Sequence, residues 1–386
     1  MCADVWARRR GGTILALIVD HTLRPESAAE AALTAARIAQ RGIAACVLRL
    51  DGLRHGPGLA ARARATRYAA LEAACAERGI VHLLLGHHAA DQAETILLRQ
   101  GAGSGPDGLA GMAEIVERRN IRLLRPLLTI EPQRLRARLQ AEAMAWVEDP
   151  SNADRKAARA RARQTLTADP SAAAALRAQA KTSATARADS ETASAEQLAD
   201  RAALYPEGYA ILSAGPLMPV ALGALLRVIG GADFSPASAA LAGLAAAPRP
   251  ATLGGVRLLP AGRLGSAGAL LLVRERLAAP VPATPGALWD GRFRVCGDLP
   301  TGTTIGPLGA DATRLRGRSL PHAIARVLPA FRMAGTLVAV PHLQYRDAVV
   351  SAGVHVVFSP LAPVCGAGFH AGAAWLRVDQ AKMNAP

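Results

Sequence analysis

The chain has few aromatic residues and few cysteines, and each of these features argues against certain classes of function. Aromatic residues make up only 3% of its 386 residues, too few for an extended platform on which bases could stack. The cysteines are odd in number and show no CxxC spacing, so they indicate neither a zinc site nor a disulfide framework. Such a set fits a reducing cytoplasm. The five cysteines are Cys2, Cys46, Cys75, Cys296 and Cys365.

Long apolar runs are also missing. The run over residues 14–19 is too short to span a bilayer, and it stops at Asp20. The sequence shows no charged start followed by a signal core and a cleavage site of small residues. We therefore expect a soluble, cytoplasmic protein with no membrane partner.

Lysine is rare as well, because only Lys156, Lys181 and Lys382 occur and the remaining positive charge is arginine. The net charge of +15 and the pI of about 10.9 favour a polyanionic partner, since each neutralised phosphate releases counterions. RNA or DNA therefore fits this chain better than an acidic protein does. Abundant arginine and alanine are also what a GC-rich coding bias would give, so the charge is supporting evidence only.

Among what is present, three apolar runs alternate with three helical patterns. The runs cover residues 13–19, 43–49 and 80–86, and the helical patterns cover residues 27–41, 59–78 and 91–101. Continuous apolarity indicates strands that are covered on both faces, as in a parallel sheet with crossover helices. The alternation predicts an α/β fold with a doubly wound parallel sheet.

The length of the chain suggests two or three domains. A stretch rich in alanine, serine and threonine over residues 168–203 has no large apolar stripe, which is typical of a weakly packed helical connector. Beyond Tyr205, short strands broken by glycine and proline indicate an α+β region. We expect a first domain over residues 1–165, a connector over residues 166–204 and a C-terminal α+β region over residues 205–386.

Polar residues follow the third apolar run and indicate an active-site edge. His87 and His88 come directly after it, and Asp91 and Glu94 follow at the start of a predicted helix. The carboxyl ends of parallel strands are where ligands bind in such sheets. His88 and Asp91 are the candidate catalytic residues, although an acid at this position also suits a helix N-terminus. His87 is more often a packing residue than a participant.

Two further groups are candidates for holding a nucleotide. Asp20 and His21 follow the first apolar run, where the acid lies in or behind a nucleotide pocket or else initiates the next helix. Gly103, Ser104 and Gly105 let the backbone approach a phosphate closely, or else cap the preceding helix. The sequence leaves both alternatives open for each group.

Five arginines are candidates for contacts with RNA. Arg64 and Arg67 lie in a predicted helix, where they either face a substrate or form ion pairs along the helix. Arg159, Arg161 and Arg163 belong to a run without an intervening acid. Such a run is either a track for nucleic-acid phosphates or, more commonly, an ordinary solvated face.

Six short motifs stand in order along about the first 165 residues. They are VDHTLRPESAAEA (19–31), ARATRYAAL (63–71), GHHAADQAET (86–95), GSGPDGLAGM (103–112), RPLL (125–128) and WVEDPSN (146–152), followed by the alternating arginines. In the last motif, Asp149 and Asn152 are expected to form a turn. Together the motifs resemble the bacterial tRNA(Ile)-lysidine synthetase family of the PP-loop (N-type) ATP pyrophosphatase superfamily.

The resemblance implies a fold and a reaction. The fold is an adenine nucleotide alpha hydrolase-like first domain, followed by a region that helps to select the tRNA. The reaction is ATP-dependent ligation of lysine to C2 of cytidine 34 in the CAU anticodon of tRNA(Ile), through an adenylated cytidine. ATP and Mg²⁺ are the implied cofactors, and tRNA(Ile) and free L-lysine are the implied partners, with a homodimer left open.

The resemblance also assigns roles. His88 and Asp91 would be catalytic, with Asp91 also a metal ligand. Asp20, His21, Gly103, Ser104 and Gly105 would bind the nucleotide, and Arg64, Arg67, Arg159, Arg161 and Arg163 would bind tRNA.

Two departures from the family pattern qualify these expectations. The family's SGGxDS phosphate loop does not occur in the chain, so we expect the chain as written not to hydrolyse ATP and the loop to be encoded upstream in the same frame. In the family's HHxDDQ pattern, Ala90 replaces the first acid, which removes a carboxylate that could help to hold Mg²⁺. The alternatives are another PP-loop tRNA-modifying or amidating enzyme, or a catalytically dead basic RNA-binding remnant. The scattered cysteines argue against a thiolase.

Overall fold

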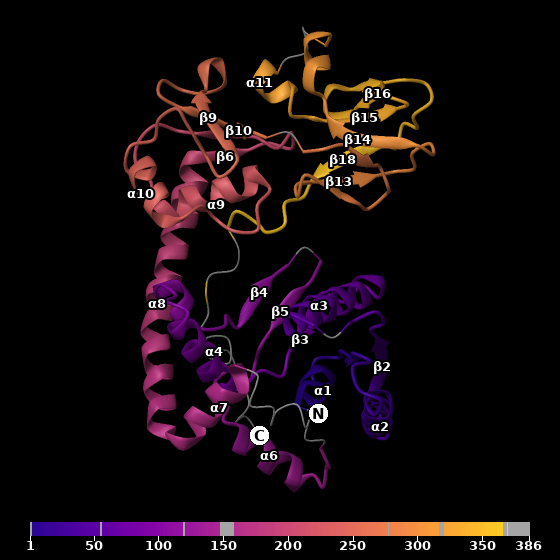
Figure 1. Cartoon of the computed structure of the whole chain (residues 1–386), viewed down its shortest axis with the longest axis vertical. Coiled ribbons are helices and arrows are strands. Elements are labelled where there is room, and N and C mark those ends of the chain that lie inside the picture. Colours follow the sequence, from indigo (N-terminus) through magenta and orange to yellow (C-terminus); the bar gives the residue numbers. More distant parts are fainter. Residues whose placement is uncertain are drawn as a thin grey trace. The chain divides into compact units, whose positions relative to one another are not determined.

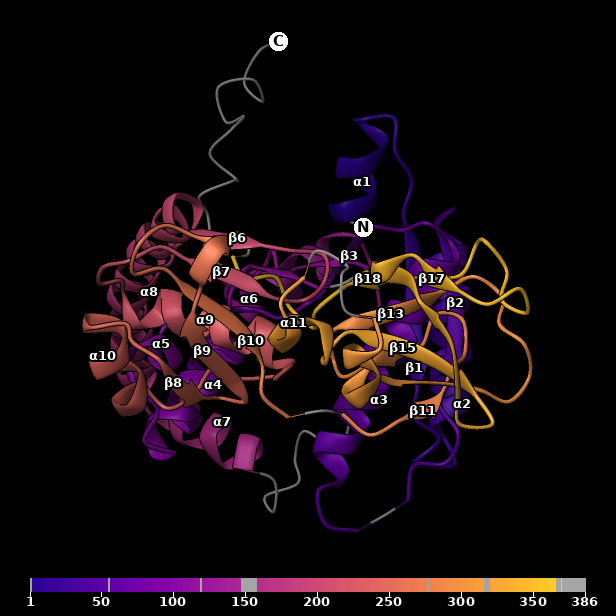
Figure 2. The same cartoon turned by 90° about the horizontal axis from the view of Figure 1, so that it is seen from above.

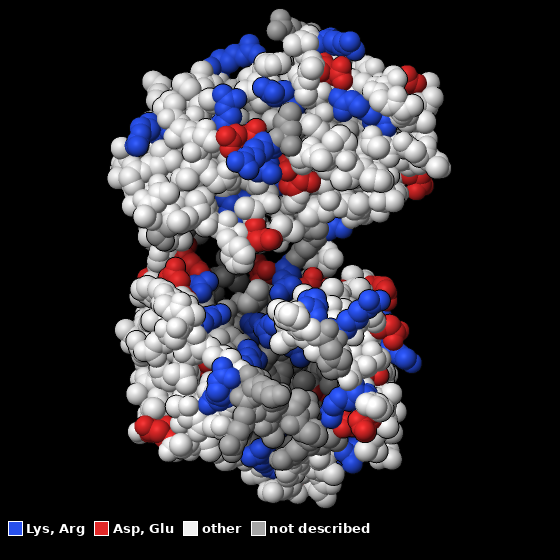
Figure 3. Space-filling model, in the orientation of Figure 1, with Lys and Arg blue, Asp and Glu red and all other residues white. Residues whose placement is uncertain are grey.

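The chain folds as two compact units (Figures 1 and 2). The computed structural model describes residues 2–54, 56–118, 120–146, 158–276, 278–315, 320–365 and 369. The first unit comprises Met1–Glu94 and Asn120–Pro170, and the second comprises Thr95–Arg119 and Ser171–Pro386. None of the helices within the described ranges is long and apolar enough to cross a membrane. Basic and acidic side chains are interspersed on the face shown in Figure 3.

The first unit alternates helices and strands. In chain order it contains α1 (Cys2–Arg8), β1 (Leu15–Asp20), α2 (Ser27–Ala39), β2 (Ala44–Arg49), α3 (Leu59–Glu77), β3 (His82–Leu84), the start of α4 (Ala89–Gly101), β5 (Arg122–Leu124), α6 (Pro132–Ala141) and α7 (Ala158–Ala168). β1 and β2 pair in parallel from Leu15 opposite Ala44 to Asp20 opposite Arg49. β3 pairs in parallel with β5.

The parallel pairing and the mixed α/β character agree with the expectation, but the cover of the strands is incomplete. β1 and β2 form one sheet, whereas β3 and β5 belong to another. The residues of β1 are mostly half-buried, and Val47 of β2 is 41% exposed. α2 packs against both strands, but its side chains are largely alanine and bury little apolar area.

The second unit begins with the C-terminal part of α4 and contains nearly all of a long helix. This helix, α8 (Pro170–Arg201), spans 32 residues and buries mainly alanine. Before it come α5 (Pro106–Leu109) and β4 (Ile115–Glu117). The predicted helical connector is therefore helical, in the form of one continuous helix.

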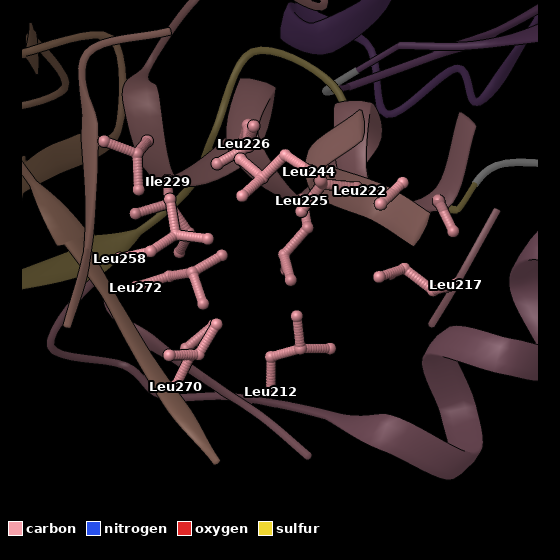
Figure 4. Packing of buried hydrophobic residues seen from close by; sticks show 14 of the residues in the cluster. Leu212, Leu217, Leu222, Leu225, Leu226, Ile229, Leu244, Leu258, Leu270 and Leu272 are labelled. Carbon is pink, nitrogen blue, oxygen red and sulfur yellow. The ribbon is translucent and has the colours of Figure 1, made fainter. Parts of the chain in front are cut away.

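A five-stranded antiparallel sheet follows α8, in the order β6-β7-β10-β9-β8. Its strands are β6 (Ala202–Leu204), β7 (Ala210–Leu212), β8 (Ala251–Leu253), β9 (Val256–Pro260) and β10 (Leu270–Arg274). α9 (Pro219–Gly230) packs against β9, β10 and α10 (Ser238–Ala246). Leu222, Leu225 and Ile229 recur at helical spacing, and they share a core with Leu258 and Leu272 (Figure 4).

The remaining strands form two more antiparallel sheets, in the orders β11-β14-β15-β16-β17 and β12-β13-β18. The elements are β11 (Val281–Pro282), β12 (Leu288–Trp289), β13 (Phe293–Cys296), β14 (Thr303–Pro307), α11 (His322–Ala325), β15 (Pro329–Met333), β16 (Thr336–Val340), β17 (Tyr345–Arg346) and β18 (His355–Phe358). Trp289, Phe293 and Phe331 lie in their core. These sheets agree with the α+β character expected of the C-terminal region.

A buried carboxylate with two arginines joins this region to the five-stranded sheet. The Asp290 side chain is 3% exposed, and its Oδ1 accepts a hydrogen bond from Arg274 Nη2 at 2.9 Å. Its Oδ2 accepts a hydrogen bond from Arg292 Nε at 2.9 Å. Arg292 also donates to the Gly208 carbonyl oxygen at 3.0 Å, in the turn between β6 and β7.

Candidate active site

Asp20 lies at the carboxyl end of β1 and closes the turn into α2. It is 4% exposed, and its Oδ1 accepts hydrogen bonds from the Thr22 N–H at 2.9 Å and from Ser27 Oγ at 2.6 Å. The bond from Ser27, followed by that from Thr22, lowers the pKa of Asp20. Thr22 has a left-handed φ of 52°. Asp20 therefore has the turn-forming role that the sequence left open, and a contact with a nucleotide stays a prediction.

His88 and Asp91 lie together where α4 begins. Asp91 Oδ2 accepts a hydrogen bond from the His88 N–H at 2.9 Å and lies 3.3 Å from His88 Nδ1. Asp91 is the third residue of α4, and it accepts a hydrogen bond from the residue just before the helix. This contact is the acidic half of a capping box. Both side chains remain partly accessible, at 27% for His88 and 18% for Asp91. Asp91 thus stabilises the helix start, and its carboxylate lies beside the His88 ring, although His88 Nδ1 has no hydrogen-bond partner among the described residues.

The environment of two further histidines of this unit favours the neutral form of the ring. Burial, together with the charge of Arg125, lowers the pKa of His87 to about 4. Burial, followed by the charge of Arg67, lowers the pKa of His21. The Nδ1 atoms of both rings are buried and have no hydrogen-bond partner among the described residues. His87 is therefore neutral at pH 7, with a ring nitrogen that can serve a ligand.

Two of the predicted arginines, Arg64 and Arg67, lie close to these histidines. Burial lowers the pKa of Arg67, and the charges of Arg64 and Arg159 act in the same direction. Arg64 and Arg67 also lower the pKa of His87. Their guanidinium groups lie 5.0 and 5.7 Å from the ring of the buried Tyr68. Arginines that repel one another in this way favour an anionic ligand, such as a polyphosphate.

Glu94 is a residue of this site for which no role was predicted. It is 1% exposed and accepts a hydrogen bond from Arg163 Nε at 2.6 Å. This bond, with the charges of Glu94 and Asp91, raises the pKa of Arg163. Glu94 Oε2 has no hydrogen-bond partner among the described residues. The available signal was its position one helical turn after Asp91, which places both carboxylates on one face of α4.

The pairing with Glu94 separates Arg163 from the other arginines of α7. Arg159 and Arg161 are exposed, whereas Arg163 is tied to a buried acid. Binding of tRNA phosphates by all three stays a prediction, and the geometry favours Arg159 and Arg161.

Replacing Arg163 by alanine should lower the free energy of unfolding by about 1–3 kcal/mol, because Glu94 would keep a buried charge without its partner. The comparison is Arg159→Ala on the same helix, where Arg159 is exposed, and this change should alter stability by no more than about 0.5 kcal/mol. Urea unfolding followed by circular dichroism measures both. The double variant Arg163→Ala, Glu94→Gln should regain part of the loss. Equal effects of the two single variants would contradict the pairing.

The glycine-rich turn belongs to the second unit and ends α4. Gly103 has a φ of 68°, and its N–H donates to the Gln100 carbonyl oxygen at 3.0 Å, as expected of a glycine that caps a helix. Gly105 is the residue before α5. A Cβ added at Gly108 would come within 2.8 Å of Ser104 Cβ. The turn thus has the capping role that the sequence allowed, and phosphate binding by Gly103, Ser104 and Gly105 stays a prediction.

Asp149 and Asn152 lie outside the described residues, together with Arg155 and Lys156. For the described part of the chain, no group of three or more His, Cys, Asp or Glu side chains could hold a metal ion. Mg²⁺ commonly binds through one or two carboxylates plus substrate phosphates. The donors present, with Asp91 foremost, therefore fit a Mg²⁺ ion that is held mainly by a bound polyphosphate.

Comparison with protein families places the first part of the chain. The model of the PP-loop domain matches residues 1–169. This range includes the carboxyl ends of β1 and β3 and the arginines of α3 and α7 described above. The match supports ATP as the nucleotide of such a domain.

Comparison with curated proteins covers most of the chain. The tRNA(Ile)-lysidine synthase of Ruegeria pomeroyi is 34% identical over 344 residues, which are 84% of this chain and 80% of that protein. The protein of the same name from Brucella suis biovar 1 is 33% identical over 373 residues, covering 89% of this chain and 82% of the relative. That of Hyphomonas neptunium is 44% identical over 170 residues, covering 42% and 46%.

A solved structure, the U34-tRNA thiolase NcsA from Methanococcus maripaludis with its [4Fe-4S] cluster, is 13% identical and covers 45% of this chain and 63% of that chain. Its TM-score is 0.37, a likeness too low to bear on function.

Proposed function

We propose, from the premise that this chain belongs to the tRNA(Ile)-lysidine synthase family, that it joins free L-lysine to C2 of cytidine 34 in the CAU anticodon of tRNA(Ile). The observation that carries the proposal is the group formed by Arg64, Arg67 and His87 beside the His88–Asp91 pair. It combines charge for a polyphosphate with an imidazole that lies beside a carboxylate. Activation with ATP is the first step, because the cytidine carbonyl oxygen is a poor leaving group.

In the activation step the arginines neutralise charge. Arg64, Arg67 and Arg159 act on one another electrostatically, so a triphosphate that enters among them relieves their repulsion. The cytidine oxygen attacks the α-phosphorus, pyrophosphate departs, and AMP remains on the oxygen. Such a reaction depends on positioning and on charge stabilisation more than on covalent help from the protein. Mg²⁺, held by Asp91 and the phosphates, would supply further charge neutralisation.

In the ligation step, Glu94 and the His88–Asp91 pair act on the lysine amine. Glu94 Oε2 is a buried acceptor without a partner among the described residues, and it suits the ammonium group of an incoming lysine. The Asp91 carboxylate lies 3.3 Å from His88 Nδ1, and a carboxylate beside an imidazole favours uptake of a proton by the ring. The lysine ε-ammonium group first gives a proton to His88. The resulting amine nitrogen forms the bond to C2, the C2–oxygen bond breaks as AMP leaves, and the second proton of the nitrogen passes to water.

The proposal extends to the organisation of the protein. Residues 1–165 would form an adenine nucleotide alpha hydrolase-like domain with a doubly wound sheet, which the parallel strand pairs and the PP-loop match support. Residues 166–204 would connect it to a tRNA-selecting region over residues 205–386. The proposed tRNA-modifying reaction supports a cytoplasmic location. Homodimer formation remains a separate proposal.

The proposal is tested with a version of the protein that carries the family's SGGxDS phosphate loop. The purified protein is incubated with ATP, Mg²⁺, radiolabelled lysine and a tRNA(Ile) transcript that carries the CAU anticodon. We expect label in the tRNA, with one AMP formed for each lysine incorporated. A transcript with uridine in place of cytidine 34 serves as the control and should stay unlabelled. Label in both transcripts, or ATP consumption without any label, would count against the proposed reaction.

Arg159 and Arg161 should account for part of the salt dependence of tRNA binding. Replacing both by alanine should weaken binding and reduce the slope of log affinity against log salt by about 0.7–0.9 for each phosphate that is no longer neutralised. Filter binding across a salt series measures the slope. Arg8→Ala is the matched control, because Arg8 is exposed and paired with Asp4. If the slope does not change, the two arginines are an ordinary solvated face.

A further inference from the structure

Two arginines from different helices hold the turn formed by residues 103–108. Arg99, near the end of α4, donates from Nη1 to the carbonyl oxygens of Gly108 at 2.8 Å and of Gly111 at 2.7 Å. Arg187, in α8, donates from Nη1 to the Asp107 carbonyl oxygen at 3.1 Å. The turn is therefore fixed by side chains as well as by its own backbone hydrogen bonds.

Arg187 is in turn fixed by two further contacts. Its Nε donates to Glu191 Oε1 at 2.7 Å, one helical turn along α8. Its guanidinium carbon lies 4.4 Å from the centre of the Phe369 ring, within the range of a cation–π interaction. Glu191 Oε2 accepts a hydrogen bond from the Phe369 N–H at 2.8 Å. Arg187, Glu191 and Phe369 thus contact one another, and Arg187 connects this group to the turn.

Phe369 is an anchor, although it lies 178 residues from Glu191 in the sequence. It is 3% exposed and packs with Ala110 and Ala184, which are each 1% exposed. The small alanine side chains leave the space that the ring fills. Ala110 follows α5 directly, so the ring contacts both α8 and the segment that continues the turn.

A cavity lies beside these contacts. Its volume is about 730 Å³, and Asp107, Arg187, Glu191 and Phe369 are among the residues that line it. Close packing therefore does not hold the turn on this side. Its position depends on the hydrogen bonds from Arg99 and Arg187, and the position of Arg187 depends on Glu191 and Phe369.

We propose that Arg187 and Phe369 are positioning residues that hold the glycine-rich turn in the shape in which Gly103, Ser104 and Gly105 receive the nucleotide. The link to ATP rests on the proposed function, whereas the restraint on the turn does not. Loss of the Phe369 ring frees the guanidinium of Arg187 to leave the Asp107 carbonyl oxygen. Loss of Arg187 removes the restraint directly.

The test compares Phe369→Ala and Arg187→Ala by two measurements, amide hydrogen exchange in the full chain and enzyme kinetics in the version that carries the SGGxDS phosphate loop. Amide hydrogen exchange in residues 103–109 should become about three- to tenfold faster in both variants, as expected when a partly exposed, charge-assisted hydrogen bond is removed. In tRNA-dependent ATP–pyrophosphate exchange, the KM for ATP should rise by a similar factor while kcat stays nearly constant. Phe369→Tyr keeps the ring and should restore both values.

Phe234→Ala is the matched control, because Phe234 also lines the cavity but is 84% exposed. It should change neither measurement. Arg187→Lys serves as the milder variant if either alanine variant fails to fold, and it should lie between wild type and Arg187→Ala. Unchanged exchange in residues 103–109 overturns the proposal. Faster exchange with an unchanged KM for ATP also overturns the positioning role, and lysine incorporation by the wild-type protein then decides the proposed function separately.

Discussion

In a version of the protein that carries the SGGxDS phosphate loop, replacing Asp91 by asparagine should lower tRNA-dependent ATP–pyrophosphate exchange by about 100-fold or more, the usual scale for losing a group that takes part in acid–base or charge stabilisation. The fold should survive, because the amide oxygen of asparagine can still accept the hydrogen bond from the His88 N–H. The negative charge beside His88, which we propose helps to hold Mg²⁺, would be lost. Initial rates of exchange at saturating ATP measure the effect.

Asp51→Asn is the control for this change. Asp51 is 73% exposed and forms an ion pair with the exposed Arg49, so its replacement should leave the exchange rate within about twofold of wild type and the stability within about 0.5 kcal/mol. Affinity for tRNA should be nearly the same in both variants. An Asp91→Asn protein that exchanges pyrophosphate at the wild-type rate would falsify the catalytic and metal-binding roles of Asp91.

Replacing Asp290 by asparagine should lower the free energy of unfolding by about 3 kcal/mol, because Arg292 and Arg274 would then face each other without the carboxylate that lies between them. Asparagine tolerates the left-handed backbone of this position, where φ is 52°. The change therefore removes charge without adding backbone strain. Equilibrium unfolding in urea, followed by tryptophan fluorescence, reports on this region, since Trp289 is the neighbouring residue and is buried.

Asp311→Asn is a suitable comparison, because Asp311 also pairs with two arginines, Arg332 and Arg314, but its side chain is 24% exposed. Solvent screens such a pair, so the expected loss is about 1 kcal/mol or less. A difference between the two variants measures the contribution of burial. If Asp290→Asn is no more destabilising than Asp311→Asn, the buried cluster does not hold this region together.

The elements of the first unit could be predicted closely from the sequence. The helical pattern over residues 27–41 corresponds to α2, and the pattern over residues 59–78 corresponds to α3. The apolar run over residues 43–49 corresponds to β2. Such local patterns are visible within one segment, because side-chain burial on a strand or helix repeats with the period of its backbone. The third run was predicted too long, since only His82–Leu84 forms β3.

Pairings between distant residues could not be predicted in the same way. Arg163 lies 69 residues from Glu94, and nothing in an alternating run of arginines distinguishes the one that meets a buried acid. The neutral state of His87 likewise depends on Arg125 and on burial, which follow from the packing of separate elements. The capping contact of Asp91 was an alternative in the sequence, and only the distance to the His88 N–H shows that it forms.

Few large apolar side chains cover β1 and β2, and this determines which part of the protein loses its structure first. These strands carry half-buried apolar side chains under a helix that is mostly alanine, whereas Leu222, Leu225 and Leu272 of the second unit are fully buried. Local opening costs least where few apolar contacts are broken. Warming or mild denaturant is therefore expected to unfold the end of β1 beside His21 while the leucine core of the second unit stays folded. The proposed site at the end of β1 would then open before most of the folded signal is lost, so a melting temperature read from the whole chain would overstate the range in which that site is intact.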